Sequence, residues 1–222
     1  MINLWGLILT ILIFEICKKL KKFRFLNKIP PMVMAGFILI VVLCAFKIDY
    51  KDYNESACFL TLLLGPATIA LAMPLSDNAK LLTKNKRAVY FGFIVAVSTA
   101  IITTIILGKI FHADWELVTS LMPKTVTTPI AIEISKIIGG IPELTACMVV
   151  LTGIFGAMFG HRILKMVKIK SDIATGLAIG ASSHVLGTST CIEKNRQKQV
   201  VMATLALIII GILTTIVCVL IF

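Results

Sequence analysis

Residues 121–133 constrain this chain most, because they place two prolines inside a strongly apolar polypeptide. The stretch reads LMPKTVTTPIAIE and includes Pro123 and Pro129. Each proline removes a backbone N–H, and its ring clashes with the preceding turn, so a helix here must kink or break. In hydrocarbon, broken backbone is tolerated only where it is buried in protein or lines a wet cavity. We therefore predict a discontinuous helical element that faces a polar cavity inside a membrane protein.

The composition agrees with a membrane setting. Of 222 residues, 58% are hydrophobic and 15% are charged, whereas about 25% are charged in a soluble domain. This length allows roughly seven crossings of about 20 residues each. The net charge of +11 could indicate nucleic acid, but the basic residues lie in short clusters between apolar runs. We expect a single all-α integral membrane domain over residues 1–222, surrounded by lipid, with no nucleic-acid partner.

The apolar runs predict six full spans, at residues 1–17, 29–46, 56–76, 88–107, 144–160 and 200–222. We expect the first run to be a retained helix, because it lacks the positive start of a signal peptide. Two further segments, 117–138 and 173–192, are interrupted by proline, or by glycine and hydroxyl residues. We predict that each dips into the membrane and returns to the side it entered. Opposed broken elements of this kind are typical of secondary transporters.

The charges between the runs predict the orientation. The loops on one side are basic, with six, four, four and three Lys or Arg in residues 18–28, 76–87, 161–170 and 193–198. Those on the other side hold Lys47, Lys51 and Lys109. The positive-inside rule makes the first set cytoplasmic. Both termini are then expected outside.

Lys124 is the sharpest candidate for a binding residue, because a lysine within an apolar segment is costly and usually functional. Together with Thr125, Thr127 and Thr128 it would present a cation and several hydroxyls. A helix that restarts near Thr128 and Pro129 would add free N–H groups and the positive end of its dipole, which bind anions. The alternative is a lysine that extends to the membrane surface beside an ordinary kink.

Two other groups could take part in coupling. Glu133 could face the same cavity and bind a proton or a cation, or it could pair with Lys136 three residues later. His184 has hydroxyl and glycine neighbours that suit unwound backbone, and it could carry a proton, or be a hydrogen-bonded core histidine. His161 and His112 are expected to lie at the membrane interface and in solvent.

The remaining sequence patterns bear on enzyme activity, cofactors and metal sites. We find no motif of a hydrolase, a kinase or a nucleotide-binding enzyme, so we expect no enzyme activity and no cofactor. The six cysteines show no paired spacing, so we expect neither a disulfide framework nor a metal site. The interruption at Gly65 and Pro66 is as compatible with a kinked span as with a functional element.

Three stretches together resemble the LrgB/CidB family of bacterial membrane proteins. They are MPKTVTTPIA at 122–131 with GGIP at 139–142, LGPATIALA at 64–72, and GLAIG at 176–180 with SHVLGT at 183–188. The resemblance covers nearly the whole chain. It departs at Ser76, where an aromatic residue is common, and at residues 194–199, which are basic here.

The resemblance implies a multi-pass protein of the bacterial cell membrane. It implies an antiholin-like role in murein hydrolase and autolysis control with a small holin-like partner, LrgA or CidA. It also implies transport of a small carboxylate such as pyruvate or glycolate. Carriers of this kind commonly assemble as homodimers, which we expect here. The motif assigns substrate binding to the following residues: Lys124, Thr125, Thr127, Thr128, Pro129, His184, Gly187 and Thr188. The open alternatives are a proton-coupled transporter and a non-transporting regulator of the partner.

Overall fold

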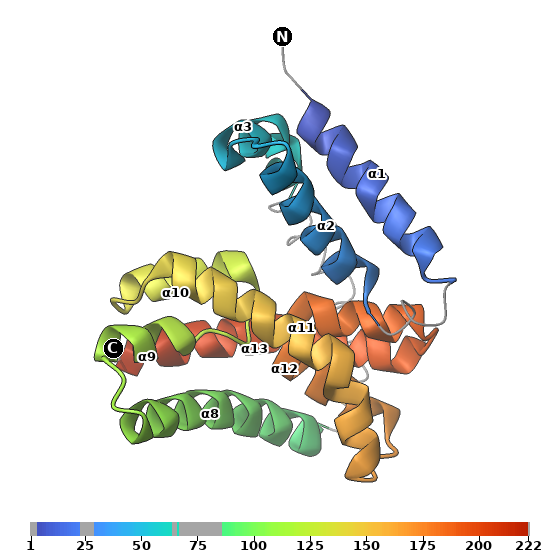
Figure 1. Ribbon diagram of the computed structural model, residues 1–222. Coiled ribbons are helices and arrows are strands. Elements are labelled where there is room, and N and C mark those ends of the chain that lie inside the picture. Colours follow the sequence, from blue (N-terminus) through green and yellow to red (C-terminus); the bar gives the residue numbers. More distant parts are fainter. Residues whose placement is uncertain (1–3, 23–28, 64–65, 67–85, 222) are drawn as a thin grey trace. The chain divides into compact units, whose positions relative to one another are not determined.

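The computed structural model describes residues 4–22, 29–63, 66 and 86–221. Within these ranges all regular secondary structure is helical (Figure 1), which confirms the predicted all-α membrane protein. The chain forms two compact units, Met1–Met73 and Pro74–Phe222. Each unit is described by itself.

The first unit contains α1 (Trp5–Leu20), α2 (Pro31–Ala45), α3 (Tyr50–Ser56) and α4 (Cys58–Leu62). Helix α2 begins at Pro31, where the missing N–H costs no helical hydrogen bond. Ile13 and Cys17 of α1 pack against Met34 and Ala35 of α2. The predicted spans 1–17 and 29–46 correspond to α1 and α2. The span predicted at 56–76 lies mostly outside the described residues, as does the interruption at Gly65.

The second unit is built on three helices of 25 residues, α8 (Lys86–Ile110), α11 (Pro142–Met166) and α13 (Gln197–Ile221). All three are long and apolar enough to cross a membrane. At 1.5 Å per residue each is about 37 Å long, more than the roughly 30 Å of a hydrocarbon core. They correspond to the predicted spans 88–107, 144–160 and 200–222.

The segment predicted to break at its prolines is a helical hairpin. Helix α9 (Trp115–Leu121) ends before a run of turns at 122–127, and α10 (Thr128–Ile137) follows. Thr119 Oγ1 donates to Gly139 O at 3.3 Å, so the chain comes back to α9 after α10 ends. Along the chain, the two short helices follow α8 and precede α11, as the colours in Figure 1 show. The predicted discontinuity at residues 122–127 is confirmed.

Helix α12 (Asp172–Glu193) is the second broken element, with two arms that meet at His184. His184 has φ 41° and ψ −133°, which is not helical. A Cβ added to Gly187 would lie 2.9 Å from Ile179 O, whereas a straight helix places residues eight apart roughly 12 Å from each other. The second arm therefore turns back against the first. The unwound backbone predicted around His184 is confirmed.

Close packing of α12 on α13 depends on glycine. A Cβ on Gly176 would lie 2.9 Å from Gln199 Cα, and one on Gly180 would lie 2.7 Å from Ala203 Cα. Both contacts are with backbone, which cannot move aside as a flexible side chain can. Ile179 and Cys191, from the two arms, share a cluster with Ala203. The first arm thus runs beside the start of α13.

The core of the second unit surrounds the α9–α10 hairpin. Helix α8 contributes residues spaced by four, which form one helical face: Val89, Phe93, Val97 and Ile101. Met122, Val126 and Ile134 of the hairpin pack in the same cluster with Met202, Leu205 and Ile210 of α13. The turns at 122–127 are therefore held in the interior by apolar anchors.

Candidate functional site

The base of the α9–α10 hairpin is closed by a buried hydroxyl cluster, here called the base clamp and made of Thr119, Ser120, Ser135 and Thr145. All four side chains are fully buried. Thr145 Oγ1 lies 2.8 Å from Ser120 O and 2.7 Å from Ser135 Oγ, and Ser120 Oγ accepts from Ile141 N at 2.7 Å. The clamp fixes both ends of the hairpin to the start of α11.

We expect Thr145→Val to weaken the second unit, because it keeps the size of the side chain and removes the hydroxyl that joins three elements. A buried partner left unpaired costs about 1–3 kcal/mol, so the thermal midpoint of the purified protein in detergent should fall. Thr103→Val is the matched control, since its exposed hydroxyl bonds only carbonyls of its own helix. Equal midpoints for the two variants would contradict a structural role for the clamp.

The hairpin tip carries Lys124 between two fully buried anchors, Met122 and Val126. Lys124 itself is half-buried, and its Nζ donates to Thr104 Oγ1 of α8. Thr104 Oγ1 in turn lies 2.8 Å from Ala100 O. The amine is therefore held inside the second unit instead of extending to bulk water. The role of Lys124 in substrate binding stays a prediction.

Thr104 was not predicted from the sequence. A threonine in an apolar helix usually bonds a carbonyl of the preceding turn, and Thr104 does so. Nothing in the local pattern separates it from Thr103, which does the same and is exposed. Only the fold brings Thr104 to Lys124.

The predicted helix restart supplies the remaining groups of the tip. Helix α10 begins at Thr128, with Thr127 at the N-cap and Pro129 in the first turn. Among the described residues, no side-chain cap bonds the first N–H groups of α10, which point back toward the tip as in any helix. Thr125 Oγ1 is buried and has no hydrogen-bond partner among the described residues. Lys124, Thr125, Thr127, Thr128 and Pro129 are thus brought together.

His184, Gly187 and Thr188 form a second group at the kink of α12. His184 is buried, and its Nε2 lies 2.9 Å from Val149 O of α11. Thr188 Oγ1 donates to His184 O at 2.9 Å. Gly153 leaves the room for the ring, since a Cβ there would lie 2.6 Å from His184 Nε2. In the described part of the chain, no hydrogen bond joins this group to the hairpin tip.

Glu133 lies apart from both groups. It is exposed and pairs with Lys136 at 2.8 Å, which is the pairing alternative considered from the sequence. Its role in coupling stays a prediction. Within the described ranges, no three His, Cys, Asp or Glu side chains gather in a way that could hold a metal ion.

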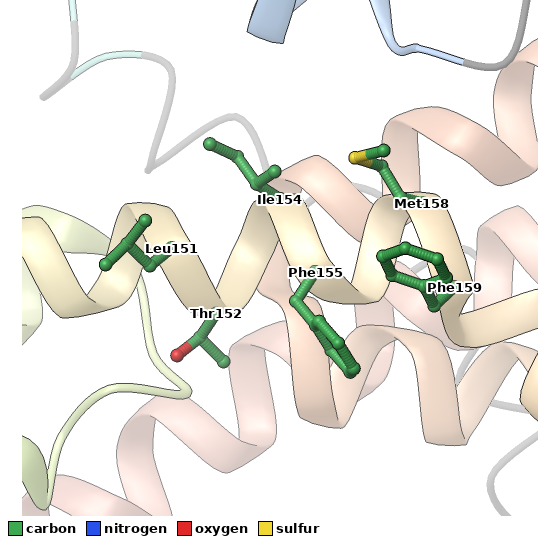
Figure 2. A pocket seen from close by; sticks show the side chains of 6 residues that line it. All are labelled: Leu151, Thr152, Ile154, Phe155, Met158 and Phe159. Carbon is green, nitrogen blue, oxygen red and sulfur yellow. The ribbon is translucent and has the colours of Figure 1, made fainter.

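An apolar groove runs along the outer face of α11, lined by Leu151, Thr152, Ile154, Phe155, Met158 and Phe159 (Figure 2). Its rings at Phe155 and Phe159 are 5.1 Å apart between centroids. None of the predicted site residues lines it. An exposed apolar face of this kind suits contact with lipid tails, and its lining side chains carry no positive charge.

Comparison with known proteins places these features in a family. A match to the family described as LrgB-like spans residues 10–222. The chain is 35% identical to the uncharacterized protein YwbG of Bacillus subtilis, over 86% of this chain and 85% of that protein. It is 31% identical to the antiholin-like protein LrgB of Bacillus subtilis, over 96% and 92%. It is 28% identical to the holin-like protein CidB of Staphylococcus epidermidis, over 84% and 82%. No solved structure matches the chain.

Proposed function

Given that this chain belongs to the LrgB-like family of membrane proteins, we propose that it is a secondary transporter of a small monocarboxylate such as pyruvate or glycolate. The observation that supports this proposal is the hairpin tip, where Lys124 bonds the buried hydroxyl of Thr104 and is followed by the buried Thr125, shortly before the start of α10. A cation, hydroxyl donors and a helix N-terminus are the groups that recognise a carboxylate.

We propose a role for each group at the tip. A carboxylate would take Lys124 away from Thr104, because a charged acceptor bonds an amine more strongly than a hydroxyl does. Thr125 Oγ1, which lacks a partner among the described residues, would donate its hydrogen to the same oxygen atoms. The first N–H groups of α10 would complete the site. Thr127 and Thr128 would line it, and Pro129 would fix the restart of the helix.

Coupling to protons belongs to the same proposal, with His184 and Glu133 as the acceptors predicted from the sequence. His184 stands where α12 is unwound and contacts α11, so a change in its charge would act on the second broken element. We propose a multi-pass protein of the bacterial cell membrane with both termini outside, acting as a homodimer. Residues 1–222 would act as one domain without enzyme activity.

Flux into vesicles that contain the purified protein tests transport directly. We expect labelled pyruvate or glycolate to accumulate when a proton gradient is imposed, and accumulation to stop when the gradient is collapsed. Vesicles without protein give the background. Absence of flux under every gradient, with protein shown to be inserted, would remove the transport proposal.

The second candidate is a regulator of murein hydrolase activity and autolysis that carries nothing itself. The names of two relatives support it, since one is called an antiholin-like protein and the other a holin-like protein. Its partner would be a small membrane protein of the LrgA or CidA kind. Flux measured with and without that partner separates the candidates. Flux only with both proteins indicates a shared transport unit, and no flux in either case favours the regulator.

A further inference from the structure

A chain of polar side chains joins α11, α12 and α13 away from the hairpin tip. His161 Nε2 of α11 lies 3.1 Å from Gln199 Oε1 of α13. Gln199 Nε2 donates to Asp172 Oδ1, in the first turn of α12, at 2.7 Å. Gln199 is 1% exposed, so both ends of its amide are used inside the protein. The sequence placed His161 at the membrane interface and singled out neither of the other two.

The carboxylate sets the direction of every hydrogen bond in this chain. An ionised carboxylate only accepts, and Asp172 Oδ1 accepts from Gln199 Nε2. Gln199 must therefore turn its NH2 toward Asp172 and its carbonyl toward His161. A carbonyl also only accepts, so the hydrogen between Gln199 and the ring belongs to Nε2. In a neutral imidazole the other nitrogen, Nδ1, is then a bare acceptor.

That bare nitrogen faces a second acceptor. His161 Nδ1 lies 3.5 Å from Thr190 Oγ1, on the second arm of α12. The Thr190 hydroxyl already donates its hydrogen to Gly187 O at 2.7 Å. Two lone pairs therefore face each other, which accounts for the long separation. One additional proton on Nδ1 would turn this contact into a hydrogen bond.

We propose that His161 Nδ1 is a proton-binding site that joins the two arms of α12. When it is occupied, the ring donates to Gln199 on one side and to Thr190 on the other. The bonded chain then runs from Asp172 in the first arm to Thr190 in the second. When it is vacant, the second arm loses that bond. The proton comes from water, and the only covalent bond that forms is the N–H bond at Nδ1.

The charged groups around the ring act in both directions. Burial of the ring opposes its positive form most, and the positive charges of Lys194 and Arg196, between α12 and α13, oppose it as well. Asp172 favours it through the amide of Gln199. Cys191 Sγ lies 3.9 Å from Nε2 and is uncharged as a thiol. The site does not depend on what the protein carries, so it holds equally for a transporter and for a regulator.

Nitrogen-15 NMR of histidine rings tests the site in the whole protein in detergent. The chain has three histidines, and His161→Gln identifies the signal by its loss. We expect the neutral ring of His161 to carry its hydrogen on Nε2, and Nδ1 to gain a proton as the pH falls from about 8 to about 4. A neutral ring protonated on Nδ1, or a ring that stays neutral throughout, overturns the proposal. This measurement needs only the wild-type spectrum and one assignment, so it stands even if other variants do not fold.

Two variants test the partners. Gln199→Leu should release the fixed tautomer, so that both neutral forms are seen. Thr190→Val should keep the hydrogen on Nε2 but require about a tenfold higher proton concentration to protonate the ring, because the new N–H has no acceptor. Ser189→Ala is the control, since its hydroxyl bonds only Leu186 O. A tautomer unchanged by Gln199→Leu, or a titration that Thr190→Val and Ser189→Ala shift equally, defeats the proposal.

Discussion

Lys124→Ala is expected to reduce carboxylate flux about 100-fold while leaving the protein in the membrane. The amine is the one positive side chain at the hairpin tip in the described part of the chain, and Thr104 is its partner there. A hydrogen bond to a charged group contributes up to about 3 kcal/mol, which corresponds to roughly two powers of ten in affinity. Initial rates at several substrate concentrations would show the loss mainly as weaker binding.

Lys136→Ala is the matched control for this loss. It removes a lysine of the same hairpin, but one that is exposed and paired with Glu133. We expect near-normal affinity for the substrate, measured without a proton gradient so that the proposed coupling role of Glu133 does not enter. Lys124→Arg keeps the charge with a different shape and should recover part of the activity. Normal flux in Lys124→Ala, at equal amounts of inserted protein, would end the assignment of Lys124 to substrate binding.

Among substitutions that add one methyl group to the second unit, Gly180→Ala is expected to lower the stability most. The added Cβ would lie 2.7 Å from Ala203 C and Cα, and backbone at that distance has to shift as a whole. Overpacking of this kind typically costs about 1–3 kcal/mol. The thermal midpoint should fall, and the first arm of α12 should separate from α13.

Gly211→Ala serves as its control within α13. Among the described residues, a Cβ there would meet only Ile130 Cδ1 at 3.4 Å, which is ordinary contact. Because alanine is a better helix former than glycine by about 1 kcal/mol, this variant should be as stable as the wild type or slightly more so. A result in which both substitutions lower the midpoint equally would show that the α12–α13 contact is looser than described.

The break in the polypeptide could be predicted because its cause is local. Pro123 and Pro129 prevent a continuous helix whatever surrounds them, and the non-helical residues 122–127 contain the first and end just before the second. The kink at His184 was indicated by neighbouring glycines and hydroxyls. The long helices followed from uninterrupted apolar runs, which depend on composition alone.

The partners of the functional groups could not be predicted, because they come from other helices. Thr104 stands 20 residues before Lys124, and Gln199 stands 38 residues after His161. Nothing in the sequence next to Thr104 or Gln199 indicates that either one bonds a functional group. For Glu133 the local rule was sufficient, since a lysine three residues later on the same helix is its partner in the structure. Glu133 lies on the exposed face of α10, whereas Ala131 and Ile134 lie on the buried face. Which face is buried depends on the neighbouring helices.

The two broken elements differ in how the surrounding helices hold them. The base clamp consists of uncharged hydroxyls and backbone groups, so neither acidification nor salt alters its bonds. The corresponding connection of α12 runs through the imidazole of His161, whose bonding changes when the ring gains or loses a proton. A fall in pH would thus act on one element and spare the other. This fold therefore combines one broken element whose attachment is independent of pH with one whose attachment depends on it.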